Sequence, residues 1–189
     1  MRILMLSIAV LLTAVGAYAQ GTVSFANVGA GLNAPVFDVD GVTKLAGPAF
    51  QAQLYVGGNT SESTLIAVPG TTVFFSGGSG YFSAGIKTLP GFPGGSRPFF
   101  QVRAWEAAGG ASYDAALAAG KKVGKSAVFK IGADLGDSIL PIGRPATLLG
   151  LTSFSLVPEP SAIVFGAVGG AILLLLSRVS KSVCRLASF

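Results

Sequence analysis

Two pairs of carboxylates are the first side chains of this 189-residue chain whose types and spacing suggest chemistry. Asp38 and Asp40, followed by Gly41, match the opening of a calcium loop, D-x-D-x-D-G. The fifth position of that loop is not occupied by a ligand, and Ala49 stands where the loop requires a glutamate. We therefore interpret the pair as part of a β-turn and keep calcium binding as the alternative.

The second pair, Asp134 and Asp137, has the residue type needed for glycoside hydrolysis or for holding an ion. Two acids in a glycine-containing loop are more typical of a solvated turn. The chain has no histidine, which excludes Ser-His-Asp and Cys-His catalysis and His-ligated zinc or haem. Its one cysteine, Cys184, excludes an internal disulfide. We expect no enzyme activity, no cofactor and no metal, and a secreted hydrolase is the weakest hypothesis.

Two further groups of side chains could contact an extracellular polymer. Three aromatic residues could stack on sugar rings, although packing is the more common role at strand positions: Trp105, Tyr55 and Tyr113. Three lysines follow a predicted helix: Lys121, Lys122 and Lys125. We interpret the lysines as favourable charges at the helix C-terminus, with acidic polysaccharide binding as the alternative, and expect no nucleic-acid partner.

The two ends of the chain hold most of its apolar residues. Only 11% of the residues are charged, whereas a soluble domain has about 25%. At the N-terminus, Arg2 precedes 13 uncharged residues, Ile3 to Val15, and the small residues Ala17 and Ala19. This three-part pattern predicts a secretory signal peptide over residues 1–19, cleaved after Ala19.

The C-terminal end begins with a short proline-containing motif: Val157, Pro158, Glu159, Pro160 and Ser161. The 18 uncharged residues from 160 to 177 would span about 27 Å as a helix, close to the hydrocarbon thickness of a bilayer. We predict a transmembrane helix over residues 161–177, with Ser161 as its N-cap. Three basic residues follow the helix and place the tail in the cytoplasm and residues 20–157 outside: Arg178, Lys181 and Arg185.

This combination of a Pro-Glu-Pro motif, one apolar helix and a short basic tail, over residues 157–185, resembles the PEP-CTERM sorting signal. That family belongs to Gram-negative bacteria that make exopolysaccharide. The resemblance implies recognition and processing by exosortase, a membrane-embedded enzyme similar to cysteine transpeptidases. Independently of the family, the prolines on both sides of Glu159 hold the backbone extended and accessible just outside the lipid.

The region from 20 to 156 shows short alternating apolar patterns interrupted by glycine and proline. This pattern predicts an all-β, mostly antiparallel β-sandwich with one short helix at Tyr113–Ala119. A hairpin is expected from residues 71–76 and 81–86 around a glycine loop. The other predicted strands are 22–28, 36–39, 50–56, 64–68, 99–105, 127–131 and 148–156.

The sequence thus favours an exported, non-enzymatic protein of the cell surface or extracellular matrix. In this interpretation the chain is anchored transiently in the membrane, processed at the Pro-Glu-Pro motif by an exosortase-type enzyme, and associated with exopolysaccharide. The alternative is a secreted carbohydrate-binding module that uses Trp105 and the lysines.

Overall fold

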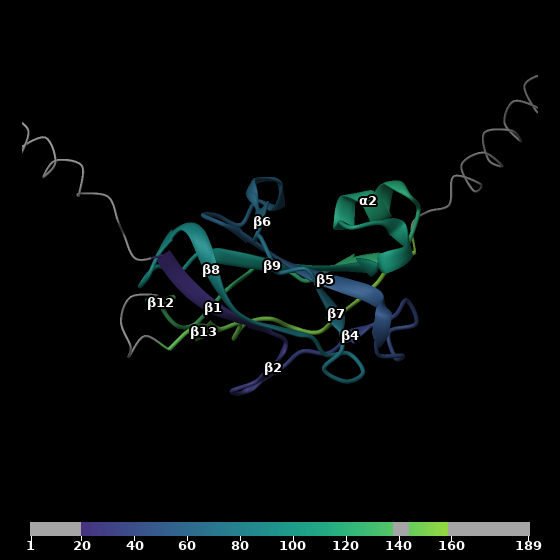
Figure 1. Ribbon diagram of the computed structural model, residues 1–189, viewed down its shortest axis with the longest axis horizontal. Coiled ribbons are helices and arrows are strands. Elements are labelled where there is room, and N and C mark those ends of the chain that lie inside the picture. The colour runs from purple at the N-terminus through teal and green to yellow at the C-terminus, as the bar shows by residue number, and fades with distance from the viewer. Residues whose placement is uncertain (1–19, 138–143, 159–189) are drawn as a thin grey trace, which may run out of the picture.

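β-strands make up most of the regular structure in the computed structural model, which describes residues 20–137 and 144–158 (Figure 1). This part of the chain is all-β with one short α-helix, which confirms the predicted class. The predicted signal peptide, 1–19, and membrane helix, 161–177, lie outside the described residues. Among the residues described, no helix has both the length and the apolar character needed to cross a membrane.

The smaller main sheet is built around the first strand. It contains β8 (Ser83–Pro93), β1 (Gln20–Ala26), β12 (Gly136–Asp137) and β13 (Ala146–Thr147). β8 runs antiparallel along one edge of β1, while β12 (antiparallel) and β13 (parallel) pair with successive parts of the other edge. Because side chains alternate along a strand, Val23 and Phe25 are fully buried and Ser24 lies on the opposite face.

The larger main sheet is centred on two long strands. It contains β5 (Gly47–Gly57), β6 (Ile66–Ala67), β7 (Val73–Phe75), β9 (Phe99–Glu106), β10 (Val123–Lys125) and β11 (Phe129–Lys130). β5 and β9 pair antiparallel without interruption from Phe50 opposite Glu106 to Gly57 opposite Phe99. The predicted strands 50–56 and 99–105 are therefore confirmed.

The main hydrophobic core is shared by the two main sheets. The larger sheet contributes alternate side chains of its long strands: Ala52, Leu54, Val56, Phe100, Val102 and Ala104. The smaller sheet contributes Val23, Phe25 and Leu89 to the same cluster. Each large apolar side chain that leaves water in this way stabilises the fold by about 1.5–3 kcal/mol.

The helix α2 (Tyr113–Ala118) covers the outer face of the larger sheet, on the side of β5 and β9 opposite β1 and β4 (Figure 1). The Ser112 Oγ accepts a hydrogen bond from the Ala115 amide at 3.2 Å, and Gly120 follows the helix with a φ of 62°. These are the expected N-cap and the glycine after the helix end, so the predicted helix is confirmed. Four buried side chains join helix and sheet: Trp105, Tyr113, Ala116 and Val123.

The predicted glycine-loop hairpin is wrong. β7 pairs with β5, whereas β8 pairs with β1, so the loop 77–80 carries the chain from one main sheet to the other. Phe75 and Phe82, on the two sides of this loop, are both buried, with ring centroids 5.5 Å apart in an edge-on arrangement. Packing of these two rings in the core outweighs the short-range turn signal.

The predicted strand over residues 148–156 is interrupted. The Leu151 amide donates to the Leu148 carbonyl at 2.9 Å, and Gly150 has a φ of 118°. This turn lets Leu148 and Leu151 both reach the core, where they are 0% and 5% exposed. Only the last part of the segment, β14 (Phe154–Ser155), pairs as a strand.

Several short elements complete the fold. β2 (Val28–Gly29) and β3 (Leu32–Asn33) form a small hairpin, and β4 (Val36–Phe37) pairs in parallel with β14. Two single-turn 3-10 helices are η1 (Glu62–Thr64) and η2 (Ala107–Gly109). The predicted strands 36–39, 64–68 and 127–131 are found as the two-residue strands β4, β6 and β11.

Asn27 is a fully buried polar residue just after β1. Its Nδ2 donates to the carbonyls of Ala34 and Gly80, each at 2.8 Å, and its Oδ1 accepts from the Phe82 amide at 2.8 Å. Its own backbone amide and carbonyl also bond to Phe82 and Ala34. One side chain therefore connects the end of β1, the approach to β4 and the loop between the sheets.

We expect Asn27→Ala to lower the free energy of unfolding by about 3 kcal/mol, because three buried backbone groups each lose a hydrogen bond. The measurement is urea denaturation of the purified protein. The control is Asn59→Ala, at an exposed asparagine that bonds only within its own loop, which should cost about 1 kcal/mol or less. Equal losses in the two variants would contradict the role given to Asn27.

Candidate functional site

The last described residues form a clamp that fixes the end of the domain, and we call residues 154–157 the exit segment. β14 lies parallel to β4, and the Leu156 amide donates to the Phe37 carbonyl at 2.9 Å. Val157 then pairs with Val123 through two backbone hydrogen bonds of 2.7 and 3.3 Å. Leu156 is only 1% exposed, so packing and backbone pairing hold the same short segment.

Gly124 explains how the exit segment can cross β10. A Cβ atom at this position would lie 2.6 Å from the Ser155 carbonyl oxygen and 3.0 Å from the Leu156 Cα. Both contacts are with backbone, which cannot move aside as the end of a flexible side chain can. The glycine at 124 therefore permits a close approach that any larger residue would prevent.

The Pro-Glu-Pro motif begins where this packing ends. Val157 is paired but 55% exposed, and Pro158 is exposed. The other residues of the predicted sorting signal and of the signal-peptidase site lie outside the described residues: Glu159, Pro160, Ser161, Arg178, Lys181, Arg185, Ala17 and Ala19. The structure thus describes the junction between the domain and the motif.

The burial of Trp105, Tyr55 and Tyr113 contradicts their predicted role as a sugar contact. The structure does bring the three rings to one face of the larger sheet, but they are 0%, 6% and 9% exposed. The Trp105 Nε1 donates to the Gly110 carbonyl at 3.0 Å, and α2 packs over the ring. A sugar stacks on an exposed ring face, and none of these residues offers one.

Arg103 occupies the space between the two tyrosines. Its guanidinium lies 4.0 Å from the Tyr55 ring centroid and 5.3 Å from that of Tyr113, within the range of cation–π attraction. Its Nε donates to the Oε1 of the fully buried Gln101 at 2.9 Å. Burial raises the pKa of the Tyr55 hydroxyl, while the charge of Arg103 opposes the rise. The cluster is an internal packing arrangement of the outer face.

On the same face, Glu62 bonds to two neighbouring side chains, Lys125 and Gln101. Its carboxylate forms an ion pair with Lys125 and accepts from the Gln101 Nε2 at 3.0 Å. The hydrogen bond from Lys125 holds the pKa of the Glu62 carboxyl below its ordinary value. Sequence reasoning did not find this cluster, because Glu62 lies in a loop far from β9 and β10 in the sequence.

In the possible calcium loop, the carboxylates of Asp38 and Asp40 are bonded to other groups of the protein. Asp40 accepts from the amides of Val42 and Thr43 at 2.9 and 2.8 Å, as expected for a turn. Asp38 forms an ion pair with Lys122 at 2.8 Å, and this hydrogen bond lowers the pKa of Asp38 and raises that of Lys122. Across residues 20–137 and 144–158, no group of three or more acidic, histidine or cysteine side chains could hold a metal ion.

The two acids of the second pair, Asp134 and Asp137, also have separate partners. Asp134 accepts from the Arg97 Nε at 2.5 Å, whereas Asp137 belongs to β12 and pairs with Gly21 through the backbone. Of the three clustered lysines, Lys122 and Lys125 already carry the ion pairs described above. The basic group therefore presents less free charge than the sequence indicated.

Comparisons with models of protein families, with curated proteins and with solved structures give no match for this chain. The case for its function therefore depends on its own residues. These are the motif that begins at Val157, the last residue of the exit segment, and the surfaces of the two sheets.

We expect Gly124→Val to destabilise the protein by about 2 kcal/mol and to release the exit segment, because the new side chain would collide with backbone at Ser155 and Leu156. Hydrogen exchange at the Val157 amide measures the release. The matched control is Gly132→Val, where no atom lies within 4 Å of the added Cβ. Unchanged exchange at Val157 in the Gly124 variant would contradict the clamp.

Stability should fall in acid as the ion pair of Asp38 is lost. A carboxyl whose pKa is lowered on folding contributes stability above its unfolded pKa, and this stability is lost as the pH falls through the lower folded value. We therefore expect the loss below about pH 4, with Asp38→Asn showing a smaller drop in Tm between neutral and acidic pH. The difference should be modest because the pair is partly exposed to solvent. Thermal unfolding at several pH values provides the measurement, and parallel curves for the two proteins would contradict it.

Proposed function

We propose that this chain is an exported cell-surface or extracellular-matrix protein that an exosortase-type enzyme processes at the motif Val157–Ser161. In this proposal the N-terminal signal directs export, and the C-terminal helix anchors the chain in the membrane with its basic tail in the cytoplasm. The sandwich-like domain then faces outward, and after processing it associates with exopolysaccharide. The domain itself needs no cofactor and catalyses no reaction.

The observation that carries the proposal is the position of the last backbone pair within residues 144–158. Val157 is bonded to Val123, and the next residues are Pro158 and Glu159. Proline restricts the backbone before it to extended conformations and has no amide hydrogen to extend the pairing. A processing enzyme would therefore find Pro158 and Glu159 at a fixed point, directly after Val157, the motif residue that is paired with the domain.

Contacts within the domain support a binding or structural role over an enzymatic one. The described carboxylates at the sites considered for catalysis or metal binding are bonded inside the protein: Asp38, Asp40 and Asp134. A catalytic carboxylate pair needs two acids that face a common substrate. Asp134 instead pairs with Arg97, and Asp38 pairs with Lys122.

The test is the intact mass and cell fractionation of the protein, made in a host with and without the processing enzyme. We expect a mature species that begins at Gln20 and ends between Val157 and Ser161, present only when the enzyme is present. Glu159→Gln should leave most of the chain with its tail, because it removes the one charge of the motif. The matched control is Asp114→Asn, the same chemical change in the first turn of α2, which should be processed normally.

A species that begins at Gln20 but retains Cys184 in both hosts would overturn the proposal. It would identify the protein as a single-span membrane protein whose tail is permanent. Normal processing of the Glu159 variant would show that the enzyme does not read this charge, and would leave the helix and prolines as the recognition elements.

A further inference from the structure

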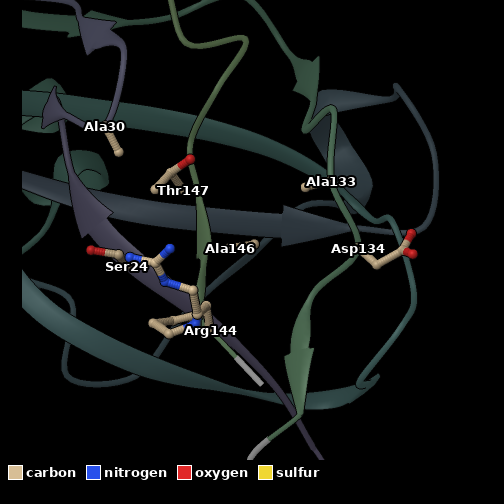
Figure 2. A pocket seen from close by; sticks show the side chains of 8 residues that line it. Ser24, Ala30, Ala133, Asp134, Arg144, Ala146 and Thr147 are labelled. Atoms are coloured by element: carbon tan, nitrogen blue, oxygen red, sulfur yellow. The ribbon is translucent and has the colours of Figure 1, made fainter. Parts of the chain in front are cut away.

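An open hollow of about 530 Å³ lies on the outer face of the smaller main sheet, beside β1 and β13 (Figure 2). Its volume falls in the range of small-molecule sites. The charged and polar side chains that line it are Ser24, Thr147, Arg144 and Asp134. They lie on the opposite sheet from the buried aromatic residues, and in the described part of the chain Asp134 alone among them forms an ion pair, with Arg97.

The register of the strands places two hydroxyl-bearing residues side by side along this hollow. Val23 pairs with Ala146, and both side chains are buried in the core. The next pair, Ser24 and Thr147, therefore points to the opposite face. Neighbouring strands are about 4.8 Å apart, so one ligand can contact both hydroxyls.

Arg144 supplies a positive charge at the same place. Figure 2 shows its side chain extending toward Ser24, with Asp134 directed away from it. The Asp134 carboxylate is already paired with Arg97 at 2.5 Å and so leaves the charge of Arg144 available. Within residues 20–137 and 144–158, the side chains of Ser24, Thr147 and Arg144 have no hydrogen bond or ion pair of their own.

The hollow continues along the sheet and so suits an extended ligand. A second, smaller hollow of about 180 Å³ shares Ser24, Ala30 and Thr147 with the first. On the other side of Ser24, its β8 partner Ile86 is 63% exposed and adds an apolar surface at the edge of the sheet. Ala30, on the rim of both hollows, has a φ of 51°, a conformation that is uncommon for any residue except glycine.

We propose that this surface binds a carboxylate-bearing sugar chain. Arg144 would pair with a carboxylate in the bidentate geometry that guanidinium groups favour. Ser24 and Thr147 would exchange hydrogen bonds with sugar hydroxyls, and Ile86 would contact the apolar face of a sugar ring. That the ligand is an extracellular polymer rests on the proposed function, whereas the preference for a carboxylate rests on Arg144.

The experiment is calorimetric titration of the full chain, purified in detergent micelles, with oligoalginate of defined length and with a neutral oligosaccharide of equal length. We expect the carboxylated probe to bind and the neutral probe to bind more weakly. Arg144→Gln should weaken binding of the carboxylated probe about tenfold, because a charge-assisted hydrogen bond is lost. Thr147→Val, which replaces the hydroxyl with a methyl group, should weaken both probes.

The matched control is Lys121→Gln, which removes the same charge in the segment between α2 and β10, on the side of the larger sheet. It should bind oligoalginate as the unchanged chain does. No binding of oligoalginate at millimolar concentration, or an equal loss in the Arg144 and Lys121 variants, would overturn the proposal. Either result would leave the C-terminal processing untouched, because that is measured separately by the mass of the mature species.

Discussion

The arrangement of the two main sheets depends on the buried amide of Asn27. A strand that ends inside a protein leaves backbone groups that must find partners, and here one side chain supplies three of them at once. Its partners are the Ala34 carbonyl before β4 and the Gly80 carbonyl and Phe82 amide of the segment that joins the sheets, so the amide helps to set the path of the chain between them. Polar groups without partners are costly in a core, which makes this arrangement specific as well as stable.

The outer faces of the two main sheets differ in how far other parts of the described chain cover them. On the larger sheet, α2 and the loop around Glu62 cover the face, and the charged residues there bond to one another. On the smaller sheet, within the part of the chain that the structure describes, small side chains and the half-buried Ser24 and Thr147 line an open hollow beside Arg144. A surface that the protein does not use for its own stability is the one that remains available to a ligand.

The parts of the fold that follow local rules could be predicted from the sequence. Alternation along 50–56 and 99–105 and the caps of α2 depend on neighbouring residues, and they are confirmed. The glycines at 77–80 are typical of a hairpin turn, which is a local signal. The packing of Phe75 against Phe82 in the core, which places the flanking strands in different sheets, is a contact that this local signal does not contain. The burial of Trp105 and the meeting of Ser24 with Thr147 require contacts between distant segments, which no single-sequence pattern contains.

The exit segment also has a mechanical consequence. Any tension that reaches the domain along the chain from its C-terminal side acts first on the Val157–Val123 bonds and then on the pairing of β14 with β4. These pairings are much shorter than that of β5 with β9, and opening them also exposes the buried side chain of Leu156. Opening the four residues 154–157 would add about 13 Å of extended chain while both main sheets stay intact. The clamp would therefore act as a short extensible tether that yields before the domain unfolds.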